Sequence, residues 1–84
     1  MYPQDHMAHF RSGYAKAQLN NHQQAIVDFG IAISILNTQG FYYIGRAQSL
    51  EQLGRKQEAL NDLLRAQQLN VAVDPAILAR LQNQ

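Results

Sequence analysis

The sequence predicts an all-helical protein of five helices, and three observations support this fold class. Ala, Leu and Gln, which are strong helix formers, dominate the interior of the chain. The two prolines, Pro3 and Pro75, lie near the two ends, where they leave the interior helices uninterrupted. No segment alternates apolar and polar residues over the length of a strand.

Breaks rich in asparagine and glycine set the bounds of each helix, because both residues tolerate the left-handed backbone that ends helices. These breaks lie at Asn20-Asn21, Asn37-Thr38, Gly54 and 70–74. The helices that they separate are predicted, in order, at 5–19, 22–36, 39–53, 56–69 and 75–83. Thr38 is a suitable N-cap for the third helix and Asp74 for the fifth, which would carry Pro75 at its favoured first position.

Length and charge limit the classes of function. The 84 residues suffice for one small domain over 1–84 with a thin core. Seven basic and six acidic side chains leave a net charge of +1, which argues against strong binding to nucleic acid or to an anionic membrane. Without cysteine the chain has no disulfide, no thiolate nucleophile and no cysteine-based metal site.

Targeting and membrane signals are not found. The chain opens without a basic segment followed by an apolar one, so a signal peptide is not predicted. The longest apolar run, 31–36, is interrupted by Ser34 and is far shorter than the ~20 residues of a spanning helix. We therefore expect a soluble protein, with the cytoplasm as its compartment.

An internal repeat emerges when the chain is aligned with a copy of itself shifted by 34 residues, so that position 18 falls on position 52. We call this shift the repeat offset. Identical residues then coincide at Gln18/Gln52, Leu19/Leu53, Gln23/Gln57, Ala25/Ala59, Asp28/Asp62 and Ala32/Ala66. The small alanines alternate with large apolar residues at positions 26, 29, 33, 60 and 63. This alternation is typical of a packed antiparallel helix pair.

These units resemble the tetratricopeptide repeat family, whose 34-residue helix–turn–helix has the pattern W-x2-L-G-x2-Y, then A-x3-F, then a later Ala and Pro. The first unit reads His9-x2-Ser12-Gly13-x2-Lys16, then Ala25-x3-Phe29 and Ala32. The second reads Tyr43-x2-Arg46-Ala47-x2-Leu50, then Gly54, Ala59-x3-Leu63 and Ala66. The resemblance implies an alpha-alpha superhelix with repeats at about 7–37 and 41–70 and a capping helix at about 75–83.

The units depart from the family pattern in several places. Lys16 replaces an aromatic residue and Ser12 replaces leucine. Asn37 and Val71 occupy the places of the closing prolines. The rival interpretation is an unrelated helical bundle whose spacing coincides with that of the repeat.

The resemblance implies a module that binds a protein or peptide, because the first helix of each unit lines a concave face. The residues that would line that face are Phe10, Tyr14, Ala17, Gln18, Phe41, Ile44, Gln48, Glu51 and Gln52. Such a surface suits an apolar peptide or a partner helix. The family's grip on the terminal carboxylate of chaperone tails needs lysine and asparagine at these positions, so that use is rejected. The alternative is that Phe10, Tyr14 and Phe41 are core or self-association residues.

Chemistry has little support in the sequence. His6 and His9 lie one helical turn apart beside Asp5, but nothing completes a metal site with them. Asp28 and Asp62 are repeat equivalents with an expected structural role, and Asp62–Arg65 and Glu51–Arg55 could pair along their helices. No base is evident for a serine nucleophile, and no glycine-rich phosphate loop is present. We expect no enzyme, metal or cofactor.

Self-association is the remaining expectation. Two units fall short of the roughly three that such arrays need for stability. The aromatic residues Tyr2, Phe10, Phe41, Tyr42 and Tyr43 are more than a body of this size would hide. A homodimer is therefore favoured. The alternative is a fragment or accessory repeat that stabilises a larger assembly and has no ligand of its own.

Overall fold

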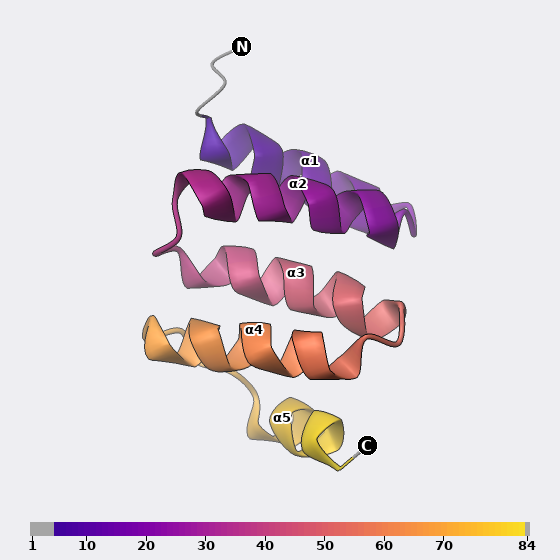
Figure 1. Ribbon diagram of the computed structural model, residues 1–84, viewed down its shortest axis with the longest axis vertical. Helices are drawn as coiled ribbons and strands as arrows, with labels where there is room; N and C mark the ends of the chain where they lie inside the picture. Colours follow the sequence, from indigo (N-terminus) through magenta and orange to yellow (C-terminus); the bar gives the residue numbers. More distant parts are fainter. Residues whose placement is uncertain (1–4, 84) are drawn as a thin grey trace.

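The computed structural model describes residues 5–83, and in that range it has five α-helices and no strand (Figure 1). The predicted all-α fold class with five helices is therefore confirmed. The helices are α1 (His6–Gln18), α2 (His22–Ile35), α3 (Gly40–Gln52), α4 (Lys56–Gln68) and α5 (Pro75–Gln82). Across 5–83, none of them combines the length and the apolar character needed to cross a membrane.

Successive helices α1 to α4 run in opposite directions and stack along the longest axis of the molecule (Figure 1). The pairs α1–α2 and α3–α4 form two helical hairpins, and α2 packs on α3 to join them. α5 packs on α4, so α1 and α5 lie at opposite ends of the stack. The described chain measures 42 × 27 × 15 Å.

Three helix ends use the left-handed conformation that the sequence predicts. Asn20, Gly54 and Asn70 have φ angles of 64°, 77° and 69° and follow α1, α3 and α4. The amide of the next residue then bonds back to the helix, as in the Schellman motif. These bonds are Asn21 N to Lys16 O (2.8 Å), Arg55 N to Leu50 O (2.9 Å) and Val71 N to Ala66 O (3.1 Å).

The connection from α2 to α3 differs from the sequence-based expectation. α3 begins at Gly40 with Gln39 as its N-cap, and no side chain bonds to its free amides. The prediction that Thr38 caps this helix is wrong, whereas the Asp74 carboxylate does accept from Ala76 N at 2.9 Å. Tertiary contact holds the α2–α3 connection instead, since the Tyr43 hydroxyl donates to the Asn37 carbonyl at 3.1 Å.

The core forms where small residues let the helices approach. Ala25, Ala32, Ala59 and Ala66 are each 0% exposed, as the alternation of small and large residues predicts. Of the large residues, Phe29, Leu60 and Leu63 are buried, while Ile26 and Ile33 are half-buried. The second hairpin and α5 share one cluster that includes Leu50, Leu63 and Leu81.

The Phe29 side chain fills the space between the two hairpins. It is 1% exposed, and two glycines face its ring. A Cβ atom at Gly13 of α1 or at Gly45 of α3 would lie only 3.0 Å from the Phe29 ring. The absence of a side chain at these two positions therefore lets α1 and α3 both close on one aromatic residue.

Candidate interaction surface

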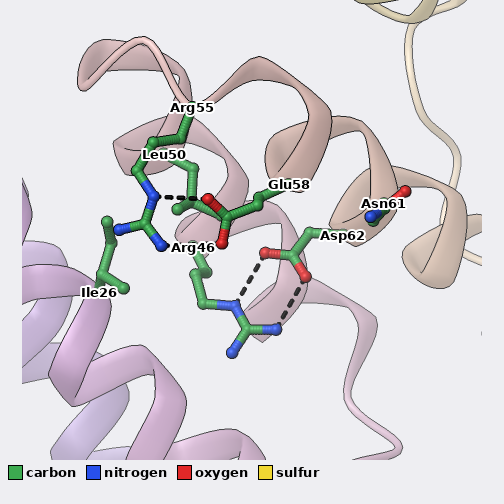
Figure 2. A pocket seen from close by; sticks show the side chains of 7 residues that line it. All are labelled: Ile26, Arg46, Leu50, Arg55, Glu58, Asn61 and Asp62. Carbon is green, nitrogen blue, oxygen red and sulfur yellow. Dashed lines mark hydrogen bonds and ion pairs between the residues drawn. The ribbon is translucent and has the colours of Figure 1, made fainter.

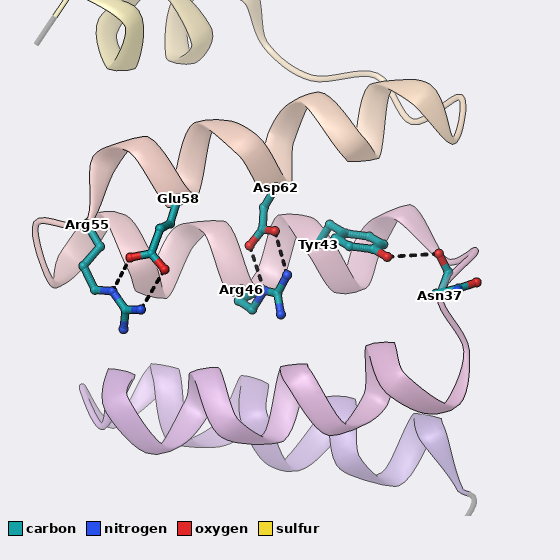
Figure 3. A network of polar contacts seen from close by, with 6 residues as sticks. All are labelled: Asn37, Tyr43, Arg46, Arg55, Glu58 and Asp62. Carbon is teal, nitrogen blue, oxygen red and sulfur yellow. Dashed lines mark hydrogen bonds and ion pairs between the residues drawn. The ribbon is translucent and has the colours of Figure 1, made fainter.

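Equivalent polar contacts hold the first helix of each hairpin to the second. The Ser12 hydroxyl donates to Asp28 Oδ2 at 2.7 Å, and the Arg46 guanidinium donates to both oxygens of Asp62 at 2.8 Å (Figure 3). The repeat offset relates Ser12 to Arg46 and Asp28 to Asp62. These contacts fix the rotation of α1 and α3, and so decide which of their side chains remain outside.

Lys16 completes the first of these contacts. Its ammonium lies 2.8 Å from Asp28 Oδ2. Burial raises the pKa of the Asp28 carboxyl, but the hydrogen bonds from Lys16 and Ser12 and the charge of Lys16 outweigh it, so this pKa lies below its usual value of 3.8. Lys16 departs from the family pattern and binds a carboxylate of α2 instead of packing an aromatic ring.

The sequence-predicted ion pairs along single helices are wrong. Asp62 pairs with Arg46 of the neighbouring helix and not with Arg65, whose guanidinium donates to Gln68. Glu51 pairs with Arg80 of α5 at 2.6 Å and not with Arg55, which binds Glu58 (Figure 3). Contacts between helices bring Asp62 to Arg46 and Glu51 to Arg80, so spacing within one helix does not reveal these two pairs.

A charged hollow of about 320 Å³ lies where α2, α3 and α4 meet (Figure 2). Its lining is Ile26, Arg46, Leu50, Arg55, Glu58, Asn61 and Asp62. Both arginines point at carboxylates in the same lining (Figure 2). Its charges neutralise one another, so the hollow offers no net attraction for an ion.

An aromatic cluster joins α1 to α3. The Phe10 ring lies between Tyr14 of its own helix, Phe29 of α2 and Tyr42 of α3, with centroid distances of 6.4, 5.5 and 4.8 Å. The Tyr42 hydroxyl is hydrogen-bonded to His6 Nδ1 at 2.5 Å. Burial, together with the charge of Asp5, raises the pKa of the Tyr42 hydroxyl and outweighs the opposing charge of Arg11.

The most apolar hollow lies beside this cluster, between the first halves of α1 and α3, and has a volume of about 380 Å³. Its lining is His6, Met7, Phe10, Arg11, Gln39, Phe41 and Tyr42. We call it the α1–α3 hollow. Met7 and Phe41 remain 49% and 60% exposed at its edge.

Two further hollows continue along α1 and α3. One lies between the ends of these helices and is lined by Ala17, Gln18, Asn20, His22, Gln48, Ser49, Glu51 and Gln52. The other lies between α3 and α5 and is lined by Ile44, Ala47, Gln48, Glu51, Leu63, Ala72, Val73, Asp74 and Ile77. Gln48 and Glu51 line both, so the two hollows adjoin at α3.

All of the sequence-predicted surface residues except Tyr14 line one of the three hollows. Phe10 and Ile44 are half-buried, since each packs on the core with one side and lines a hollow with the other. Gln18, Phe41, Gln48 and Gln52 are exposed, Ala17 and Glu51 are half-buried, and all of these also line hollows. Tyr14 is exposed and stacks on Phe10 without lining a hollow.

Of the residues that line the α1–α3 hollow, sequence reasoning placed only Phe10 and Phe41 on the binding face and missed five, namely His6, Met7, Arg11, Gln39 and Tyr42. A signal for Met7 exists in the sequence, because the repeat offset relates Met7 to Phe41 and gives both the same place in their units. Arg11 and Gln39 have no such signal. Their positions depend on how closely α1 and the start of α3 approach.

Two of the histidines, His6 and His22, and two of the expected surplus aromatic rings have partners inside the fold. His22 Nδ1 is bonded to the Ser49 hydroxyl at 3.1 Å, and no three metal-binding side chains gather anywhere in the part of the chain described. Tyr42 and Tyr43 are buried, so the fold hides two rings that the sequence counted as surplus surface. Tyr2 lies outside the described residues.

Comparison of the chain with family models, with curated proteins and with solved structures gives no match. The assignment of repeat units therefore depends on equivalences within the chain. These are the two Asp contacts, the left-handed turns at Asn20 and Gly54, and the four buried alanines.

Proposed function

We propose that the chain is a tetratricopeptide-type repeat module that binds a protein or peptide segment along the face of α1, α3 and α5, with no chemistry, metal or cofactor of its own. The observation that carries this proposal is the row of three hollows along these helices, with Met7 and Phe41 exposed at its apolar end. Amide side chains such as Gln48 follow toward the other end and could bind a peptide backbone.

The repeat assignment is supported by features that recur at the repeat offset, which equals the length of the family's unit. Each unit places an aspartate of its second helix against position 12 or 46 of its first. Each also turns between its helices through a left-handed residue, Asn20 or Gly54. An unrelated bundle has no reason to repeat both a polar contact and a turn at one period.

Selection of peptides from a random display library on the immobilised chain tests the proposed function. A selected peptide is expected to bind the Phe41→Glu variant at least about tenfold more weakly, because a charge would replace the most exposed ring of the face. Leu64→Glu is the matched control. Leu64 is 37% exposed on α4 and lines none of the three hollows.

Equal loss of binding in both variants would contradict the proposed face, as would a library that yields no binder. Circular dichroism of each variant separates lost binding from lost structure. A peptide that binds Phe41→Glu as well as wild type would place the interaction on another surface.

A second candidate function, self-association or a place in a larger helical assembly, is favoured by the outer side of α1. The repeat offset relates Ala8 and Ala15 to Tyr42 and Ser49, which are buried against the first hairpin. Ala15 is exposed, and so is Leu19 one turn further on. The equivalent side of α3 is a packing surface, so we expect this side of α1 to be one as well. We propose that a second copy of the chain covers it.

Molar mass from light scattering across a range of concentrations tests this second candidate. We expect a dimer that the Ala15→Glu variant converts to a monomer, because the charge would be buried at the contact. Gln57→Glu, on the exposed side of α4, should remain dimeric. A wild-type chain that stays monomeric at high concentration would rule out the dimer and leave the role in a larger assembly.

A further inference from the structure

We infer that the α1–α3 hollow binds an apolar, preferably aromatic, side chain of a partner whose neighbouring residue is aspartate or glutamate, and that Arg11 binds that carboxylate. This inference rests on the proposed function and names the chemistry of the segment that the face would select. It follows from the volume of the hollow, from the residues that line it, and from its one arginine, Arg11, which makes no hydrogen bond or ion pair with the described residues.

The hollow suits one large apolar side chain. Its volume of about 380 Å³ lies at the lower end of the range for small-ligand sites. Phe10, Phe41 and Tyr42 supply aromatic surface, and Met7 supplies a flexible thioether that adapts to different shapes. The Tyr42 ring is held in place by Phe10 and by its hydrogen bond to His6, so this part of the wall is preorganised.

Arg11 gives the hollow its charge preference. Among the arginines within residues 5–83, it alone makes no hydrogen bond or ion pair. The others are held by Arg46–Asp62, Arg55–Glu58, Arg65–Gln68 and Arg80–Glu51 contacts. Arg11 is exposed and lines the α1–α3 hollow, with no carboxylate in that lining. A partner carboxylate beside the hollow would therefore gain a charge-assisted hydrogen bond without breaking an existing one.

A carboxylate on a side chain fits this face better than one at a chain terminus. The face continues beyond the α1–α3 hollow into the two hollows that contain Gln48. A segment that carries aspartate or glutamate beside its apolar anchor can extend through these hollows. A terminal carboxylate at Arg11 would end the partner chain there.

The test uses three peptides that differ only in their carboxylates. The first is acetyl-Ala-Asp-Trp-Ala-amide, the second replaces Asp by Asn, and the third carries Asn with a free carboxylate at its C-terminus. Because the chain has no tryptophan, emission of the peptide indole reports binding without background from the protein. Amide chemical shifts of Gln39, Phe41 and Tyr42 in NMR spectra locate the site.

The Asp peptide is expected to bind about fivefold more tightly than the Asn peptide, with its largest shifts at the α1–α3 hollow. Arg11→Gln should remove this difference, whereas Arg65→Gln, an exposed arginine of α4, should preserve it. Circular dichroism should show unchanged helicity in both variants, since neither residue is in the core.

Equal binding of the Asp and Asn peptides would overturn the role of Arg11, as would a preference for Asp that survives Arg11→Gln. If only the free-carboxylate peptide binds more tightly than the Asn peptide, the ligand of Arg11 is a chain terminus and not an acidic side chain, which would also overturn this inference. Shifts confined to α4 and α5, or no binding of any of the three, would overturn the site. These results leave the proposed function standing if library peptides still depend on Phe41.

Discussion

Replacement of Phe29 by alanine is expected to lower the free energy of unfolding by about 4 kcal/mol. The side chain is 1% exposed and lies between α1, α2 and α3, so its loss leaves a cavity that several helices would have to move to fill. Gly13 and Gly45 face the ring and have no side chains that could extend into the space. The two hairpins would lose the side chain that packs between them.

Thermal unfolding followed by circular dichroism measures this effect. In a domain of this size, about 4 kcal/mol corresponds to a fall in Tm of roughly 15 to 30 °C. Phe41→Ala is the matched control, because it removes the same side chain from a position that is 60% exposed. We expect its stability to change by less than about 0.5 kcal/mol. Similar losses in the two variants would show that Phe29 is not a core residue.

The contrast between these phenylalanines also shows how far the sequence can predict the fold. Periodicity identifies the buried positions within each helix, so Ala25, Phe29 and Ala32 follow from the pattern of α2 alone. It does not distinguish the two sides of Phe10, which packs on Phe29 and also lines the α1–α3 hollow. Whether a ring is core or surface depends there on a neighbouring hairpin.

The sequence could predict residues of the candidate surface only where equivalent positions of the two repeat units have the same environment. Phe41, Gln48 and Gln52 follow from their places on α3. Arg11 does not, because its repeat equivalent is Gly45, a buried residue that faces Phe29. The first unit has no preceding hairpin within residues 5–83, so a position that is closed in the second unit is open in the first. Sequence equivalence fails at the edge of a stack for this reason.

Two arginine–carboxylate pairs whose carboxylates lie on α4 provide the second large prediction (Figure 3). Both are bidentate, with donor–acceptor distances of 2.8 Å for Arg46–Asp62 and of 2.6 and 2.8 Å for Arg55–Glu58. They differ in burial, since Asp62 is buried and Arg46 is half-buried, whereas Arg55 and Glu58 are exposed. Their hydrogen bonds are alike, but Arg46–Asp62 is partly buried and joins α3 to α4, whereas Arg55–Glu58 is exposed and spans one turn at the start of α4.

Asp62→Ala is expected to lower the free energy of unfolding by about 2 to 3 kcal/mol, because it leaves the half-buried Arg46 guanidinium without its carboxylate. In the wild type Asp62 raises the pKa of Arg46 through its hydrogen bonds, and the variant loses this effect. The guanidinium nevertheless stays charged, because an arginine side chain does not lose its proton in a protein, so neutralisation cannot relieve this cost. Glu58→Ala should leave unfolding by urea unchanged within error, since both partners of its pair remain solvated.

A double variant separates the cost of an unpaired charge from a loss of packing. If Asp62→Ala acts by stranding the cation, adding Arg46→Met should recover part of the lost stability, because no charge then remains between α3 and α4. If the double variant is less stable than Asp62→Ala alone, Arg46 contributes through contacts that methionine does not reproduce, such as that of its guanidinium with the Tyr43 ring, whose centroid lies 5.8 Å away. In that case the repeat equivalents Ser12 and Arg46 would serve mainly to pack the first helix of each unit on the second. Their hydrogen bonds to aspartate would be secondary.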